Sequence, residues 1–430
     1  MNYRSTRGQV PDTGLAAALR AGLAADGGLY VPAALPVLGT ADFAGLTDLP
    51  AIAERLLRPF FADDALAAAL PAICREAFDF PAPLVPFGDG SSQLLELFHG
   101  PTAAFKDFGA RFLAACLARL PAPAAAPLTI LVATSGDTGA AVAAAFHRRP
   151  GFRVVILYPD GRVSPRQAHQ LGCFGDNVLA LRVAGSFDDC QRLVKQALAD
   201  RDLQARVPLS SANSISLGRL LPQMSYYAVA ALAQARTSGG ALDLIVPTGN
   251  LGNALAALLA RAIGLPIGRV ALASNANRVL PDFFAGAPYA PRASVATLAN
   301  AMDVGAPSNF ERLCWLYPDE ARLRAAVTAE AVDDATIRAT IRTVAERHGH
   351  VLCPHTACAA AVLGRLREAG DRGQWTVVAT AHPAKFEMVV EPLVGRRVEP
   401  PPALAALLGH VATAEPLPAD AAALRARLLR

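Results

Sequence analysis

Short apolar runs alternate with helical segments along most of the chain, and this alternation constrains the fold more than any other feature. Runs at 128–133, 154–158 and 242–246 are rich in Leu, Ile and Val, and helical patterns separate them. Continuous apolar runs are typical of parallel strands, because helices bury such strands on both faces. The sequence therefore predicts an α/β fold with two parallel sheets.

Further elements follow the same rhythm. Strands are expected at 178–183, 270–274 and 376–381, and helices at 110–120, 140–146, 187–199, 254–263 and, as one long element, from Ser214 to about residue 236. The first 90 residues differ, because helical patterns at 49–61 and 65–78 lie among Pro and Gly breaks. The predicted division is a helical N-terminal module (1–92), a first α/β domain (93–212), a second α/β domain (213–399) and a C-terminal helical tail (400–430).

Charge and composition exclude several classes of partner. Lys plus Arg total 40 against 36 Asp plus Glu, and no basic block stands out, so nothing favours nucleic acid or a membrane surface as a partner. No apolar run is long enough to span a bilayer. The seven cysteines are scattered and odd in number, which favours reduced thiols and a cytoplasmic location.

One lysine has an unusual setting. Lys106 lies between the aromatic residues Phe105 and Phe108, downstream of the break at Pro101 and just before an apolar helix. Desolvation disfavours the ammonium form and leaves a lone pair for attack on a carbonyl. The chain has only three lysines, so lysine is expected mainly where arginine cannot replace it, as in imine formation. The alternative is a lysine that extends to solvent from an apolar helix start.

Two loops follow predicted strands and open predicted helices. The loop after strand 242–246 has Gly249, Asn250, Leu251, Gly252 and Asn253. Its glycines and the following helix N-terminus are suited to phosphate, although a tight turn would need glycine equally. Its glycine spacing is neither that of a P-loop nor that of a dinucleotide fingerprint.

The second loop, after strand 128–133, places hydroxyl and carboxylate groups at a helix start. Ser135 and Thr138 are candidates for binding a carboxylate or phosphate, and Asp137 is a candidate for a polar ring substituent. The alternative is an ordinary capped helix start. A cofactor with both an aldehyde and a phosphate would use the lysine and both loops, and pyridoxal 5'-phosphate is that cofactor.

Other polar segments are candidates for substrate contacts. Asn213 and Ser214 precede Arg219, whose guanidinium is suited to a bidentate grip on phosphate. Thr380 lies at the end of the last predicted strand, and Lys385 follows it as either an anion ligand or a helix-start residue. The segment 353–358, with two Cys and one His, has no partner cluster and favours a structural reading over a metal site. We therefore predict no metal.

The motifs together resemble the threonine synthase family, in its bacterial and fungal branch. The resembling segments are 5–8, 26–29, 96–102, 105–109, 134–139, 213–215 with Arg219, 249–253, 301–304 with 307–309, and 380–386. Each is weak alone, whereas their order and joint presence are specific. The resemblance implies pyridoxal-phosphate fold type II, with two parallel-sheet α/β domains and the helical N-terminal module.

The resemblance also implies residue roles. Lys106 would form the Schiff base with the cofactor, the amides from Gly249 to Asn253 would hold its phosphate, and Thr380 would contact its pyridine nitrogen. Asp137 stands where relatives of this fold place an asparagine that faces the ring hydroxyl. Ser135, Thr138, Asn213, Ser214 and Arg219 would bind the substrate anions, with the division between its phosphate and its carboxylate left open.

The implied reaction converts O-phospho-L-homoserine and water to L-threonine and phosphate. We expect this small molecule as the partner of a monomer or homodimer. One alternative is a phospho-lyase on the same scaffold that releases 2-oxobutanoate. Others are a non-catalytic pyridoxal-phosphate-binding protein and a nucleotide-binding α/β protein, and the last of these would show no visible absorbance.

Overall fold

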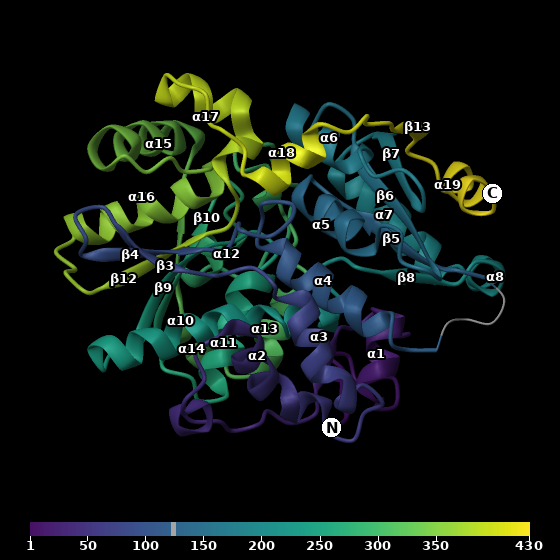
Figure 1. Cartoon of the computed structure of the whole chain (residues 1–430), viewed down its shortest axis with the longest axis horizontal. Helices are drawn as coiled ribbons and strands as arrows, with labels where there is room; N and C mark the ends of the chain where they lie inside the picture. Colours follow the sequence, from purple (N-terminus) through teal and green to yellow (C-terminus); the bar gives the residue numbers. More distant parts are fainter. Residues whose placement is uncertain (122–125) are drawn as a thin grey trace.

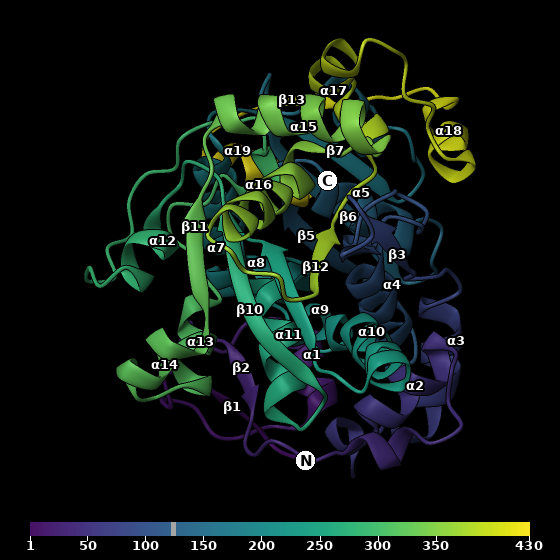
Figure 2. The same cartoon turned by 90° about the vertical axis from the view of Figure 1, so that its left-hand side faces the viewer.

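The computed structural model describes residues 1–121 and 126–430, which form two large, mainly parallel sheets and one small one (Figures 1 and 2). Helices cover both faces of each large sheet, as predicted for an α/β fold. Residues 122–125, within the predicted first domain, lie outside the described residues. None of the helices in the described ranges is long and apolar enough to cross a membrane.

The N-terminal module is helical, with a small sheet. Strand β1 (Tyr3–Ser5) pairs antiparallel with β2 (Tyr30–Pro32), and the α-helices of the module are α1 (Leu15–Ala21), α2 (Leu49–Leu57) and α3 (Leu70–Ala77). Helix α2 begins where the Asp48 side chain accepts a hydrogen bond from the Ala51 amide, a normal N-cap. The module lies at the bottom of Figure 1 and packs on α4 (Lys106–Leu117) and α10 (Gln223–Ser238) through the apolar faces of α2 and α3.

The first large sheet has the strand order β13-β7-β6-β5-β8 and is parallel throughout. Its strands are β5 (Leu128–Ala133), β6 (Phe152–Pro159), β7 (Val178–Ala184), β8 (Leu209–Ser211) and β13 (Glu415–Pro418). Helices α5 (Asp137–Phe146) and α6 (Pro165–Gly172) pack on one side, and α7 (Phe187–Ala199) packs on β5, β6 and β8. Three of its strands were predicted, whereas β8 and β13 are short and lack a clear apolar run.

The second large sheet has the order β11-β10-β9-β12-β4-β3, with only the β3–β4 pair antiparallel. Its strands are β3 (Leu84–Phe87), β4 (Ser92–Glu96), β9 (Leu242–Pro247), β10 (Ile267–Ser274), β11 (Thr328–Ala331) and β12 (Trp375–Ala379). Helix α16 (Pro354–Glu368) covers one face under α15 (Asp334–His348), and α11 (Gly252–Ala262) and α10 cover the other.

The remaining elements are mostly short. They are α4 (Lys106–Leu117), α8 (Arg201–Arg206), α9 (Leu217–Leu220), α10 (Gln223–Ser238), α12 (Val279–Phe284), α13 (Phe310–Leu316), α14 (Glu320–Ala326), α17 (Glu387–Val394), α18 (Pro402–Leu408), α19 (Ala421–Leu428), and the 3-10 turns η1 (Thr40–Phe43), η2 (Arg58–Phe61), η3 (Ala67–Ala69), η4 (Asn300–Met302) and η5 (Pro383–Phe386).

Three sequence expectations need correction. The long helix expected after Ser214 is two helices, α9 and α10, because Pro222 between them cannot donate a backbone hydrogen bond. The tail is not purely helical, since β13 adds to the first sheet. Strand β4 pairs with β12, so residues 93–96 belong to the second sheet rather than to the first domain. The other domain boundaries stay a prediction.

Candidate active site

Lys106 is the first residue of α4, and the end of β12 fixes its position. Ala104 forms a β-bridge with Ala381, and the Phe105 amide donates to the Thr380 carbonyl over 2.8 Å. The His382 amide donates in turn to the carbonyl of Ala103 over 3.0 Å. These bonds bring the lysine and Thr380 to one pocket, which both residues line.

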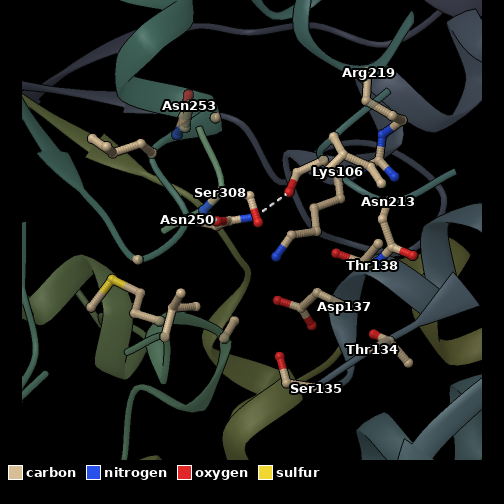
Figure 3. Close-up of a pocket in the computed structure, with 18 of the residues that line it drawn as sticks. Lys106, Thr134, Ser135, Asp137, Thr138, Asn213, Arg219, Asn250, Asn253 and Ser308 are labelled. Atoms are coloured by element: carbon tan, nitrogen blue, oxygen red, sulfur yellow. Dashed lines mark hydrogen bonds between the residues drawn. The ribbon is translucent and has the colours of Figure 1, made fainter. Parts of the chain in front are cut away.

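The surroundings of Lys106 favour an uncharged amine. Its amine lies 5.1 Å from the centre of the Phe105 ring and points into the pocket (Figure 3). Burial lowers the pKa of Lys106 to about 8, an effect that Asp137 opposes and Arg219 adds to. The second expected aromatic contact is absent, because Phe108 packs instead against Phe78, Phe80 and Tyr226.

The predicted phosphate loop joins β9 to the N-terminus of α11. In the described part of the chain, the amides from Gly249 to Leu251 have no acceptor, and the first amides of a helix lack intrahelical partners. Leu251 has a φ of 66°, a left-handed conformation that turns the chain into the helix. A Cβ on Gly249 would lie 2.6 Å from the Met302 Cα, so this position requires glycine.

Two asparagines organise this loop. The Asn253 side-chain oxygen accepts hydrogen bonds from Tyr226 and Tyr227, while its Nδ2 is buried without a partner among the described residues. Asn250 donates to the Ser214 hydroxyl over 2.6 Å, the bond drawn in Figure 3, and accepts from the Ser308 amide. Asn250 therefore ties three loops together, and Asn253 offers a free donor.

The second predicted loop opens α5. The Thr134 hydroxyl accepts hydrogen bonds from the amides of Gly136 and Gly139 and so stabilises the start of the helix. Ser135 and Thr138 line the pocket. Gly136 has a φ of 130°, and a Cβ there would lie 2.6 Å from the Gln167 side chain. The sequence predicted Ser135 and Thr138 as pocket residues but gave no role to Thr134.

Asn213 and Arg219 differ in how much of their bonding capacity is used. The Asn213 amide group is engaged by the backbone of Ala133, to whose carbonyl it donates over 2.6 Å. Arg219 is 3% exposed and donates to the Ala212 carbonyl, but its Nε has no partner in the described residues. Burial lowers the pKa of Arg219 to about 10. Arg219 is thus a buried cation that faces the pocket without a carboxylate in an ion pair within the described chain.

Asp137 forms a buried ion pair that the sequence did not predict. Its Oδ1 lies 3.1 Å from the Lys385 amine and accepts from Gln167 Nε2 over 3.0 Å. Gln167 is held in place by Asn300, whose Nδ2 donates to the Gln167 Oε1 over 3.0 Å. Lys385 therefore contacts a protein carboxylate rather than the pocket space.

Several other pocket residues were missed. Helix α7 contributes one face to the pocket wall, including Gln191 and Lys195, so all three lysines lie at or next to this pocket. A helix spacing of four residues was the available signal for that face. In the segment 353–358, Cys353 caps α16 through the Thr356 amide, and His355 lines the pocket and accepts from the Ala301 amide.

Arg312 links the N-terminal module to this site. The side chain is 1% exposed and donates to the carbonyls of Tyr30 and Ile215 and to the Asn309 side chain. Asn309 in turn donates to the Asn250 carbonyl over 3.0 Å. The module therefore supports the Ser214 and Asn250 loops through one buried guanidinium.

Comparison with known proteins identifies the family. The profile described as "Threonine synthase N terminus" matches residues 2–78, "Pyridoxal-phosphate dependent enzyme" matches 87–383, and "Threonine synthase, C-terminal" matches 356–427. Threonine synthase of Serratia marcescens is 41% identical over 416 residues, which are 96% of each chain. The chain belongs to the threonine synthase family.

Solved structures of this family agree along the whole length. The crystal structure of threonine synthase from Escherichia coli matches with a TM-score of 0.92 and 38% identity, covering 100% of this chain and 99% of that one. Pyridoxal-phosphate-bound threonine synthase from Brucella melitensis matches with a TM-score of 0.89 and 35% identity over the same shares. The chain is thus a pyridoxal-phosphate-dependent lyase of this family, and the predicted fold class is confirmed.

The residues present fit this cofactor. A partly desolvated amine suits its aldehyde, and the free amides at the start of α11 with the unpartnered Nδ2 of Asn253 suit a phosphate. Gly249 leaves no room for a side chain at that position. Buried polar groups without partners are uncommon in native proteins, so donors left free in one pocket indicate a bound polar group.

Proposed function

We propose that the substrate is O-phospho-L-homoserine and that water converts it to L-threonine and phosphate in this pocket. The observation that carries the proposal is Arg219, a buried guanidinium that has no ion-pair carboxylate among the described residues and lines the same pocket as Lys106 and the α11 amides. One set of donors suffices for the cofactor phosphate. A buried cation in addition to those amides suits a substrate that carries a strong anion of its own.

In this proposal the cofactor is held by residues from both large sheets. Lys106 would hold it at its aldehyde carbon, and the amides of Gly249, Asn250, Leu251, Gly252 and Asn253 would hold its phosphate. Thr380 would contact its pyridine nitrogen, and Asp137 would contact its ring hydroxyl. When bound, the cofactor supplies an electron sink that stabilises negative charge on the substrate carbons next to the amino group.

The chain itself moves the protons and binds the leaving group. The Nζ of Lys106, with a pKa near 8, takes protons from Cα and Cβ of the substrate and returns protons to Cγ and Cα. Phosphate leaves from Cγ with the electron pair of the C–O bond, the hydroxyl of water adds to Cβ, and the remaining proton of water goes to the released phosphate. Arg219 stabilises the charge that develops on the departing phosphate. Ser135, Thr138, Asn213 and Ser214 supply further donors to the substrate phosphate and carboxylate.

Product analysis tests the proposal. Purified protein with pyridoxal phosphate should convert O-phospho-L-homoserine to equal amounts of L-threonine and phosphate, and Lys106→Ala should abolish both products. Release of 2-oxobutanoate in place of threonine would identify the phospho-lyase alternative. Absence of any phosphate release would remove this substrate from the account.

A further inference from the structure

The Asp137–Lys385 ion pair joins the two large sheets behind the pocket. Asp137 starts α5 after β5, and Lys385 lies in η5 after β12. The Lys385 side chain is fully buried, and its amine lies 3.1 Å from the Asp137 Oδ1 and 2.6 Å from the carbonyl oxygen of Thr102, to which it donates. A fully buried ammonium needs such partners because it has lost its water.

Helix α6 fixes the backbone that carries Lys385. The Ser164 hydroxyl donates to the Lys385 carbonyl over 2.8 Å, and Arg166 donates to the Ala384 carbonyl over 2.6 Å. From the same helix, Gln167 donates to Asp137. Both members of the pair are therefore held by one helix, and their separation is a built feature.

Asp137 also faces a second amine. In Figure 3 the amine of Lys106 and the carboxylate of Asp137 point into the same space. Among the described residues, Lys385 is the cation in an ion pair with Asp137, and Lys106 forms none. We propose that Lys385 is a positioning residue, which neutralises Asp137 and thereby leaves Lys106 as the reactive amine.

The electrostatics follow from this geometry. Burial alone would raise the pKa of Asp137, but Lys385, and then Lys106 and His355, hold it well below its usual range. Asp137 is therefore a permanent anion. After Lys385, Lys106 is the cation with the largest effect on that anion. Without Lys385, the carboxylate would stabilise the ammonium form of Lys106, which cannot attack an aldehyde.

Other titratable groups around the two residues do not supply the missing charge. Burial lowers the pKa of His355 to about 4 and that of His382 to about 4, so both are neutral at pH 7. Three other ionisable groups lie nearby. Asp107 accepts hydrogen bonds from Thr102, Arg219 acts on Lys106, and Cys353 is a buried thiol whose pKa burial raises. Lys385 is thus the cation placed to balance Asp137.

The inference rests on the proposed role of Lys106, and a pH titration of the holoprotein tests it. The visible absorbance of the bound cofactor reports protonation of the Lys106 nitrogen. In Lys385→Met, the apparent pKa of that absorbance should rise, with a proton affinity at least tenfold higher than in wild type. In Lys385→Arg, which keeps the charge, it should stay near the wild-type value.

Removal of the carboxylate gives the opposite sign. Asp137→Asn should lower the apparent pKa, since Lys385 is then an unpaired cation, and the double variant Asp137→Asn/Lys385→Met should return toward wild type. If Lys385→Met does not fold, the two variants that carry Asp137→Asn still test the proposal. A wild-type titration in Lys385→Met, or a double variant no closer to wild type than either single change, would overturn the proposal.

Borohydride reduction separates this inference from the proposed role of Lys106. If reduction attaches the cofactor to Lys106 and the titrations do not shift, the role of Lys385 fails alone. If the label is found elsewhere, the role assigned to Lys106 fails first, and the inference about Lys385 fails with it.

Discussion

Replacement of Arg219 by methionine is the sharpest test of the second anion site. The guanidinium is 3% exposed, so its pairing with a substrate anion takes place away from water. Truncating one partner of a buried charge pair costs about 2–5 kcal/mol. At about 1.36 kcal/mol for each tenfold change in rate, kcat/KM should fall about 30-fold to about 5,000-fold. A surface ion pair would give at most about 1 kcal/mol, or about fivefold.

The stability of the free protein should respond much less than its activity. Burial lowers the pKa of Arg219 to about 10, which means that the folded chain holds this cation at a cost in free energy. Arg219→Met should therefore change the thermal midpoint of unfolding little while activity falls, because relief of the buried charge offsets the lost hydrogen bond to the Ala212 carbonyl. The kcat/KM of Arg219→Lys should lie between those of wild type and Arg219→Met, because lysine keeps the charge and loses the planar, bidentate geometry of the guanidinium.

The assay is phosphate release from O-phospho-L-homoserine, with cofactor binding followed by visible absorbance. A matched control is Arg111→Met, since Arg111 donates to the carbonyls of Glu76 and Ala77 on the module side of α4. That control should lose stability and keep kcat/KM. A kcat/KM within fivefold of wild type for Arg219→Met would refute the buried-anion reasoning.

Three further predictions use other parts of the structure. Gly249→Ala should weaken cofactor binding at least tenfold by equilibrium titration, because its Cβ would lie 2.6 Å from the Met302 backbone, whereas Gly364→Ala, with open space around it, should bind normally. Arg312→Met should lower the free energy of unfolding in urea by about 2–6 kcal/mol, because it leaves two buried carbonyls unpaired at about 1–3 kcal/mol each. In cofactor-free protein, acylation of Lys106 should rise tenfold per pH unit below about pH 8 and level off above it, since only the uncharged amine reacts.

Each of these has a clear contradiction. Normal cofactor affinity in Gly249→Ala would show that the loop can accommodate a Cβ at this position. An unchanged urea midpoint and slope in Arg312→Met would mean that the module is not anchored by this residue. A labelling rate that still climbs steeply above pH 9 would indicate an ordinary lysine pKa.

The sequence predicted the elements that carry loops better than the contacts between them. Strands 128–133 and 242–246 are apolar throughout, so the loops that follow them were assigned to the carboxyl ends of parallel strands, which is where the structure places them. Ser135 and Thr380 were assigned to this edge from the strands that precede them, and Lys106 was added from its aromatic setting and from the cofactor chemistry. All three line the pocket.

Contacts between distant segments were not accessible from local patterns. Lys385 was left open between an anion ligand and a helix-start residue, because its partner Asp137 lies 248 positions away and only strand order brings the two together. The same holds for β4, whose pairing with β12 depends on sheet order rather than on its own composition. Arg312 was given no role from the sequence, because nothing nearby in sequence indicated the buried carbonyls of Tyr30 and Ile215.

The most direct test of the account is the site of covalent attachment of the cofactor. The chain has three lysines, so borohydride reduction of the holoprotein followed by peptide mass spectrometry gives an unambiguous answer. We predict the reduced pyridoxyl mass on Lys106, with Lys195 and Lys385 unmodified and the visible band lost. A label on either of the other two lysines, or no label at all, would contradict the central claim.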